Sequence, residues 1–123
     1  MNLFLLATIV VASAMPTANE VNQQLIDAAK NGNEMLVKDL LQNSAIDINA
    51  NEKDFYGLTA LTSAAMNGHD KVVKLLLKNS AIDVNKVNTG YFMQTPLMLA
   101  AENGHENVAK QIVQNSGDSH FML

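Results

Sequence analysis

One phrase recurs three times along the chain at a fixed spacing of 36 residues. Its central copy, AAMNGHDKVVKLLLKNSAIDVN, occupies residues 64–85. The first copy occupies residues 28–49 and the third residues 100–116, and no gap is needed to align them. A unit that cannot bury its apolar face alone buries it against its neighbours, so this repeat predicts a stack of similar units.

Within each unit the pattern predicts two helices joined by a tight turn. In the central copy, paired alanines allow close helix approach, and Gly68 follows them at a point where the first helix is expected to end. Glycine takes the left-handed conformation of a helix C-terminus without strain from a Cβ atom. The second helix has its apolar residues at i, i+4 and i+5, which places them on one face. These residues are Leu36, Leu40 and Leu41, then Val72, Leu76 and Leu77, then Val108, Ile112 and Val113.

The units resemble the ankyrin repeat, whose pattern runs roughly G-x-T-P-L-H-x-A-A-x-x-G-H, then V-V-x-L-L, then G-A-D-V-N. The second unit reads GLTALTSAAMNGH at residues 57–69, and the third reads TPLMLAAENGH at residues 95–105. The resemblance covers residues 21–116. It implies an all-α solenoid of about three helix-turn-helix units, with short β-hairpin or loop connections.

Threonine and proline mark the predicted start of the first helix in the later units. Thr59 and Thr95 are suited to capping a helix N-terminus, and Pro96 falls at the first helical position, where a missing N–H is tolerated. The histidine of the family's T-P-L-H motif is replaced by Thr62 and Met98, which puts its usual hydrogen bonds in question.

The connections between units depart from the family in length. The chain keeps a period of 36 residues, whereas the family period is about 33 residues. The extra residues fall largely in residues 50–58 and 86–94, which we expect to form projecting β-hairpins with long tips. Asp47 and Asp83 recur in phase, at positions that the family uses for hydrogen bonds within turns.

The N-terminal segment is predicted to be a signal peptide covering residues 1–14. Its apolar run ends in Ala-Ser-Ala, the small-x-small arrangement that signal peptidase accepts. It is too short to cross a bilayer, which takes about 20 apolar residues. We therefore expect a secreted or periplasmic protein with no stable membrane span after cleavage. The alternatives are an uncleaved apolar helix that caps the stack and a cytoplasmic location.

The rest of the chain is predicted to form one domain. A polar lead-in is expected at residues 15–20 and the repeat domain at residues 21–123. Its three units are placed at about residues 21–56, 57–92 and 93–123. A chain of 123 residues is long enough for one domain and too short for two.

Composition excludes several classes of function. The chain has no Arg, its eight Lys are scattered and its net charge is −4, so nucleic acid is not an expected partner. It has no Cys, and no Ser or Thr stands in a recognisable nucleophile pattern, so no enzyme and no cofactor are predicted. The absence of Cys leaves the redox compartment open.

The charged residues have a structural interpretation. Acid and lysine stand at i, i+4 at the start of each second helix, an arrangement that stabilises a helix by about 0.2–0.5 kcal/mol per pair. The pairs are Glu34 and Lys38, Asp70 and Lys74, and Glu106 and Lys110.

Two histidines in successive units raise the question of a ligand site. His69 and His105 match the Gly-His position of the family, where the role is structural. Units about 10 Å apart hold imidazoles too far apart to share one metal ion with bonds near 2 Å. The alternative function keeps them as residues through which an accessory protein of an extracytoplasmic enzyme handles a cofactor or metal.

Aromatic residues concentrate in the two connections, as Phe55-Tyr56 and Tyr91-Phe92 in register. Large aromatics on projecting tips are typical anchors of protein interfaces. The alternative is that they pack on each other and hold the tips together.

In the ankyrin family, the tips and the two positions after the paired alanines form the recognition surface. Carried over by position, this surface comprises Phe55, Tyr56, Leu58, Tyr91, Phe92, Gln94, Met66, Asn67, Glu102 and Asn103, and Lys30 and Asn31 extend it. The resemblance thus implies a non-catalytic module, expected to be a monomer, that recognises another protein through hairpin tips and the concave helix face.

Overall fold

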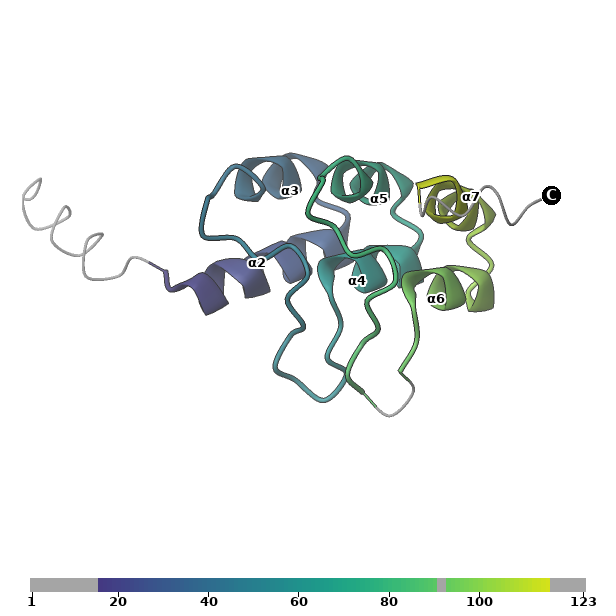
Figure 1. Cartoon of the computed structure of the whole chain (residues 1–123), viewed down its shortest axis with the longest axis horizontal. Coiled ribbons are helices and arrows are strands. Elements are labelled where there is room, and N and C mark those ends of the chain that lie inside the picture. The colour runs from purple at the N-terminus through teal and green to yellow at the C-terminus, as the bar shows by residue number, and fades with distance from the viewer. Residues whose placement is uncertain (1–15, 91–92, 116–123) are drawn as a thin grey trace, which may run out of the picture.

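The computed structural model describes residues 16–90 and 93–115, which form six helices in two layers (Figure 1). The inner layer holds α2 (Ala18–Asn31), α4 (Ala60–Asn67) and α6 (Pro96–Glu102) side by side. The outer layer holds α3 (Glu34–Leu40), α5 (Asp70–Leu77) and α7 (Glu106–Asn115). Each unit contributes one helix to each layer, which confirms the predicted all-α stack of three helix-turn-helix units.

The helix ends follow the sequence signals. Gly32 and Gly68 have φ of 72° and cap α2 and α4 in the left-handed conformation. Thr59 and Thr95 are N-caps, and Pro96 is the first residue of α6. The first helix begins earlier than expected, at Ala18 within the segment expected to be a polar lead-in, because the Thr17 hydroxyl accepts a hydrogen bond from the Glu20 amide at 3.2 Å.

Thr62 replaces the family histidine with a hydrogen-bond pair of its own. Its hydroxyl accepts from the Thr59 amide at 2.6 Å, while the Thr62 amide donates to the Thr59 hydroxyl at 3.0 Å. This reciprocal pair is a capping box, and it satisfies two backbone donors at the start of α4. Met98, at the same position of the third unit, has no hydroxyl and is exposed.

The two connections project from one side of the stack, below the inner layer in Figure 1. Residues 16–90 and 93–115 contain no strand, so the expected β-hairpins are loops in the described part of the chain. One backbone hydrogen bond closes each loop, from Glu52 to Leu58 at 2.8 Å and from Asn88 to Gln94 at 3.1 Å. At the tip of the first loop, the Asp54 carboxylate accepts from the amides of Tyr56 and Gly57 at 3.0 Å each.

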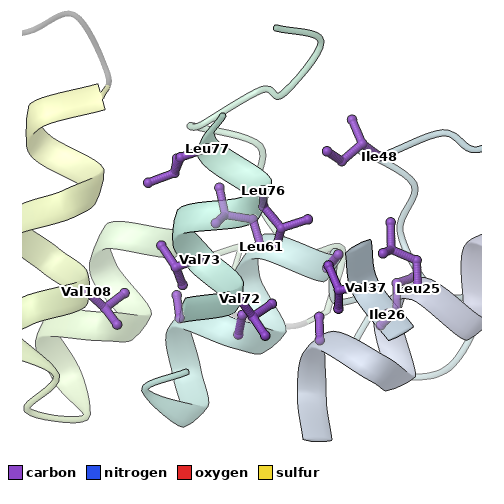
Figure 2. Close-up of a cluster of buried hydrophobic side chains, with 14 of the residues drawn as sticks. Leu25, Ile26, Val37, Ile48, Leu61, Val72, Val73, Leu76, Leu77 and Val108 are labelled. Carbon is purple, nitrogen blue, oxygen red and sulfur yellow. The ribbon is translucent and has the colours of Figure 1, made fainter. Parts of the chain in front are cut away.

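An apolar core runs through the stack between the layers (Figure 2). The repeat position that Leu36 occupies in the first unit shows how the stacking of units produces this core. Val72 and Val108 occupy this position in the later units and are 1% exposed, because each packs against the preceding unit. Leu36 belongs to the first unit, where no described unit precedes it, and is 40% exposed. Burial at this position therefore comes from the neighbouring unit and not from the unit itself.

One histidine in the second unit and one in the third form a hydrogen bond with the preceding unit. The Nε2 atom of His69 lies 2.9 Å from the Lys30 carbonyl, and that of His105 lies 3.0 Å from the Met66 carbonyl. A carbonyl only accepts, so each Nε2 carries a proton and donates. The imidazole of His105 also lies against Gly68, where an added Cβ would come within 2.5 Å of Nδ1. The structural role expected for the Gly-His pairs follows from these contacts.

Polar side chains join the loops in the same way. The Asn49 amide group donates to the Ala81 carbonyl at 2.8 Å and accepts from the Asp83 amide at 2.7 Å. Asp47 and Asp83 accept from amides two residues on, at 3.0 Å each, as expected for turn residues. Adjacent units are thus connected by hydrogen bonds as well as by apolar contact.

One of the three predicted helix ion pairs forms. Lys110 lies 3.5 Å from Glu106. No ion pair within 4.0 Å joins Asp70 to Lys74 or Glu34 to Lys38 in the described structure, which is consistent with the small value of exposed pairs.

Truncating one repeated leucine at two places tests the stacking. Leu61 on α4 is 1% exposed, whereas Leu97, at the same position of α6, is 36% exposed because no described unit follows it. We expect Leu61→Ala to lower the free energy of unfolding by about 2–5 kcal/mol. Leu97→Ala is the matched control and should cost about 1 kcal/mol or less, since half-exposed side chains contribute less burial. Urea unfolding measures both, and equal losses would contradict the stacked arrangement.

Candidate functional site

A groove of about 590 Å³ lies between the inner helices and the projecting loops. Its floor and walls come from α2, α4, α6 and both connections, so no single unit forms it. The residues that line it are Lys30, Phe55, Tyr56, Leu58, Met66, Asn88, Gly90, Gln94, Leu99, Glu102 and Asn103.

The structure brings most of the predicted surface residues together around this groove. Those that line it are Phe55, Tyr56, Leu58, Met66, Gln94, Glu102 and Asn103. Asn67 does not line it, and its side-chain amide donates to the Ser63 carbonyl on its own helix at 2.9 Å. Tyr91 and Phe92 lie outside the described residues.

The floor of the groove is apolar and largely buried. Leu58 and Leu99 are each 5% exposed and Met66 is half-buried. Leu58 was expected on the recognition surface, but it mainly fills the floor, since the chain turns into α4 directly after it. Leu99 was not expected in the groove, and its i+3 spacing from Pro96 on one helix face is the signal that could have identified it.

The rim of the groove carries the exposed aromatics of the first connection. Phe55 and Tyr56 are 66% and 63% exposed. Their rings meet edge to face with centroids 5.7 Å apart, an arrangement that is favourable beyond the area it buries. The two rings therefore support each other within one tip and still present most of their surface to the outside.

Backbone contacts hold the two connections side by side. The Thr89 amide donates to the Gly57 carbonyl at 3.1 Å. Asn51 donates to that carbonyl at 2.7 Å and also to the Val87 carbonyl at 3.1 Å. Glycine is required for the approach, because a Cβ on Gly57 would lie 1.7 Å from the Thr89 hydroxyl and φ there is 58°. These bonds fix the described part of the groove wall.

A buried carboxylate lies beneath this wall. The Glu52 side chain is only 2% exposed and lies 3.9 Å from the Lys30 ammonium. Gln23 donates to one carboxylate oxygen at 3.4 Å, while the other, Oε1, has no hydrogen-bond partner in the described structure. Burial, with a further contribution from the nearby Asp54 carboxyl, raises the pKa of Glu52 above its ordinary value.

The neighbouring Asp54 shifts in the opposite direction. Partial burial alone would raise its pKa, but the amides of Gly57 and Tyr56 donate to its carboxylate at 3.0 Å each and lower the pKa instead. The two carboxyls of this loop therefore titrate in different ranges.

The histidines proposed as possible ligands are used in stacking. The Nε2 atoms of His69 and His105 donate to the carbonyls of the preceding unit. Across residues 16–90 and 93–115, no group of three or more metal-ligating side chains gathers at one point. None of the helices described here has both the length and the apolar character needed to cross a bilayer.

The two-layered stack of helix pairs, with loops projecting beside a shared groove, defines a helical repeat solenoid. A model of ankyrin repeats in three copies matches residues 25–121, and the chain belongs to the ankyrin repeat family. Ankyrin repeats are generally protein–protein interaction modules. A search of the curated proteins found no match to this chain.

The buried carboxylate makes stability depend on pH. The pKa of Glu52 is raised in the folded state, so protonation of this carboxyl favours the folded protein. This contribution to the free energy of unfolding is fully present below pH 4.5, the ordinary pKa, and is lost as the pH rises through the folded-state pKa. Glu52→Gln is neutral at every pH. We therefore expect the urea midpoint of Glu52→Gln at pH 7 to exceed that of the wild type. The midpoint of this variant should also change less between pH 4.5 and 7 than the wild-type midpoint does.

Glu34→Gln is the control for this series, because it removes an exposed carboxyl from the other layer. It should follow the wild-type pH profile. Identical profiles for the wild type and Glu52→Gln would show that burial of this carboxylate has no energetic consequence.

Proposed function

We propose that the chain is a non-catalytic adaptor that binds a partner protein in the groove between the inner helices and the loop tips. The observation that carries the proposal is the convergence of an apolar floor and two exposed aromatic side chains on one concave surface. Concave sites with apolar linings and a few polar groups are the usual places for binding.

The rim aromatics support the choice of a protein as the partner. Tyrosine is enriched among the residues that dominate interface energies, and truncation of such residues costs about 2 kcal/mol or more. Phe55 and Tyr56 leave more than half of their surface in water in the absence of a partner. Their burial by a partner would remove apolar area from water at about 25 cal/mol per Å².

The rigidity of the wall supports the same proposal. The bonds from Asn51 to the Val87 carbonyl and from Thr89 to the Gly57 carbonyl hold the loops together before any partner arrives. A surface that is already ordered loses little conformational entropy on binding, so more of the contact energy appears as affinity.

We also propose that the adaptor acts outside the cytoplasm as a monomer. The support for export is the sequence of residues 1–14, which lie outside the described part of the chain. Expression in a bacterial host should yield a mature protein that begins at Met15, as read by N-terminal sequencing. A mature chain that begins at Met1 would favour the cytoplasmic alternative.

A charge placed on the groove floor tests the binding site. Met66→Asp puts a carboxylate at the centre of the groove, where a partner would have to desolvate it. Partner capture from the extracytoplasmic fraction should fall at least tenfold, measured by quantitative pull-down against the wild type.

Met35→Asp is the matched control, since Met35 is 79% exposed on α3 in the other layer. It should capture the same partner as the wild type. Melting curves establish that both variants are folded, and Tyr56→Ser replaces Met66→Asp if the latter unfolds. Equal capture by the wild type and the groove variants would argue against this groove as the binding site.

A further inference from the structure

One repeat position places three different chemical groups along the groove. Lys30, Met66 and Glu102 are each 36 residues apart and occupy the same position near the ends of α2, α4 and α6. All three line the groove, and their helices lie side by side in the inner layer (Figure 1). The groove therefore runs from a cation, across an apolar thioether, to an anion.

The cation at the first end retains hydrogen-bonding capacity. The Lys30 side chain is 40% exposed, and its only ion pair in the described structure is the 3.9 Å contact with Glu52. An ammonium has three N–H donors, so this long contact leaves donors available. An acidic group of a partner would be attracted to this end.

The anion at the other end is also accessible. Glu102 is exposed, and its Oε2 atom accepts a hydrogen bond from the Gln94 side chain. Its Oε1 atom makes no contact with another polar group among the described residues. A carboxylate has about four acceptor sites, so it remains able to bind a lysine or arginine of a partner.

The polar groups along the groove favour an extended segment over a helix. The backbone N–H groups inside an α-helix already bond to carbonyls of the same helix, whereas those of an extended segment are unpaired. The side-chain oxygens of Gln94 and Asn103 line the groove, have no donor among the described residues and are suited to accept from these groups.

The spacing of the units sets the spacing of the partner's residues. Packed helices lie about 8–10 Å apart, and a chain in the extended polyproline II conformation advances about 3.1 Å per residue with three residues per turn. One unit of the stack therefore corresponds to about three residues of such a partner. Side chains three residues apart lie on the same face of this chain, so those that face three successive units would stand at i, i+3 and i+6.

We propose that the groove binds an extended peptide segment with an acidic residue, an apolar residue three positions away and a basic residue three positions beyond that. The acidic side chain faces Lys30, the apolar one covers Met66 and the basic one faces Glu102. This assignment rests on the proposed function and adds the chemistry of the partner. The segment crosses the stack from the first unit to the third.

Selection from a phage-displayed library of random linear 12-residue peptides tests this pattern. The full chain is immobilised as wild type, Lys30→Gln and Glu102→Lys. Wild type should enrich peptides with acidic and basic residues six positions apart and an apolar residue midway. Lys30→Gln should lose the acidic preference, and Glu102→Lys should replace the basic preference by an acidic one.

Affinities of individual peptides make the test quantitative. Fluorescence anisotropy at low salt should show that the best wild-type peptide binds Glu102→Lys at least fivefold more weakly. The same peptide with its basic residue changed to glutamate should bind Glu102→Lys more tightly than it binds the wild type. Higher salt should reduce both differences, because these charges are accessible to solvent.

Two failures are distinguishable. Peptides that require Met66, as judged by loss of binding to Met66→Asp, but carry no charge pattern would overturn this inference and leave the groove as a binding site. A library that yields no peptide dependent on Met66 would overturn the inference together with the proposed function.

Discussion

The structure depends on burial between successive units. No unit buries its own apolar face. Leu36 is exposed, whereas Val72 and Val108 at the same repeat position are buried, so the neighbouring unit supplies the burial. The alanines at the centre of each first helix allow this approach, since Ala64 and Ala100 are fully buried. The stability of the stack and the groove therefore have one origin, because the contact that buries the core also places α2, α4 and α6 in the row that forms the groove.

Hydrogen bonds between units add a geometric constraint to this apolar contact. His69 and His105 bind carbonyls of the preceding unit, and the side chain of Asn49 bridges successive loops. Such bonds contribute about 1 kcal/mol each to stability. Their larger effect is on register, since a rotation of one unit would leave a buried carbonyl without its donor. The fixed register keeps Lys30 and Glu102 at opposite ends of one groove.

The repeat was sufficient to predict the helices and their glycine and threonine caps, because these features are set within one unit and copied at a fixed period. The surface residues were expected from the resemblance to ankyrin repeats, and seven of them line the groove. Features that depend on burial or on the conformation of the connections were harder to predict. Leu58 was expected to be a surface contact and instead fills the floor, and the first connection is a loop in which Asp54 accepts from the amides of Tyr56 and Gly57. Burial of Glu52 was not predicted, since it depends on Lys30 and Gln23 of another element.

The two ends of the stack differ in chemistry. The first helix presents Gln24 and Asp27 to solvent, whereas the last unit leaves Met98 and Ala101 exposed. An extra repeat engineered onto this protein would therefore meet an apolar surface at the last unit and a polar surface at the first. Each module added there would lengthen the row of inner helices by one, so the length of the groove would grow with the number of units.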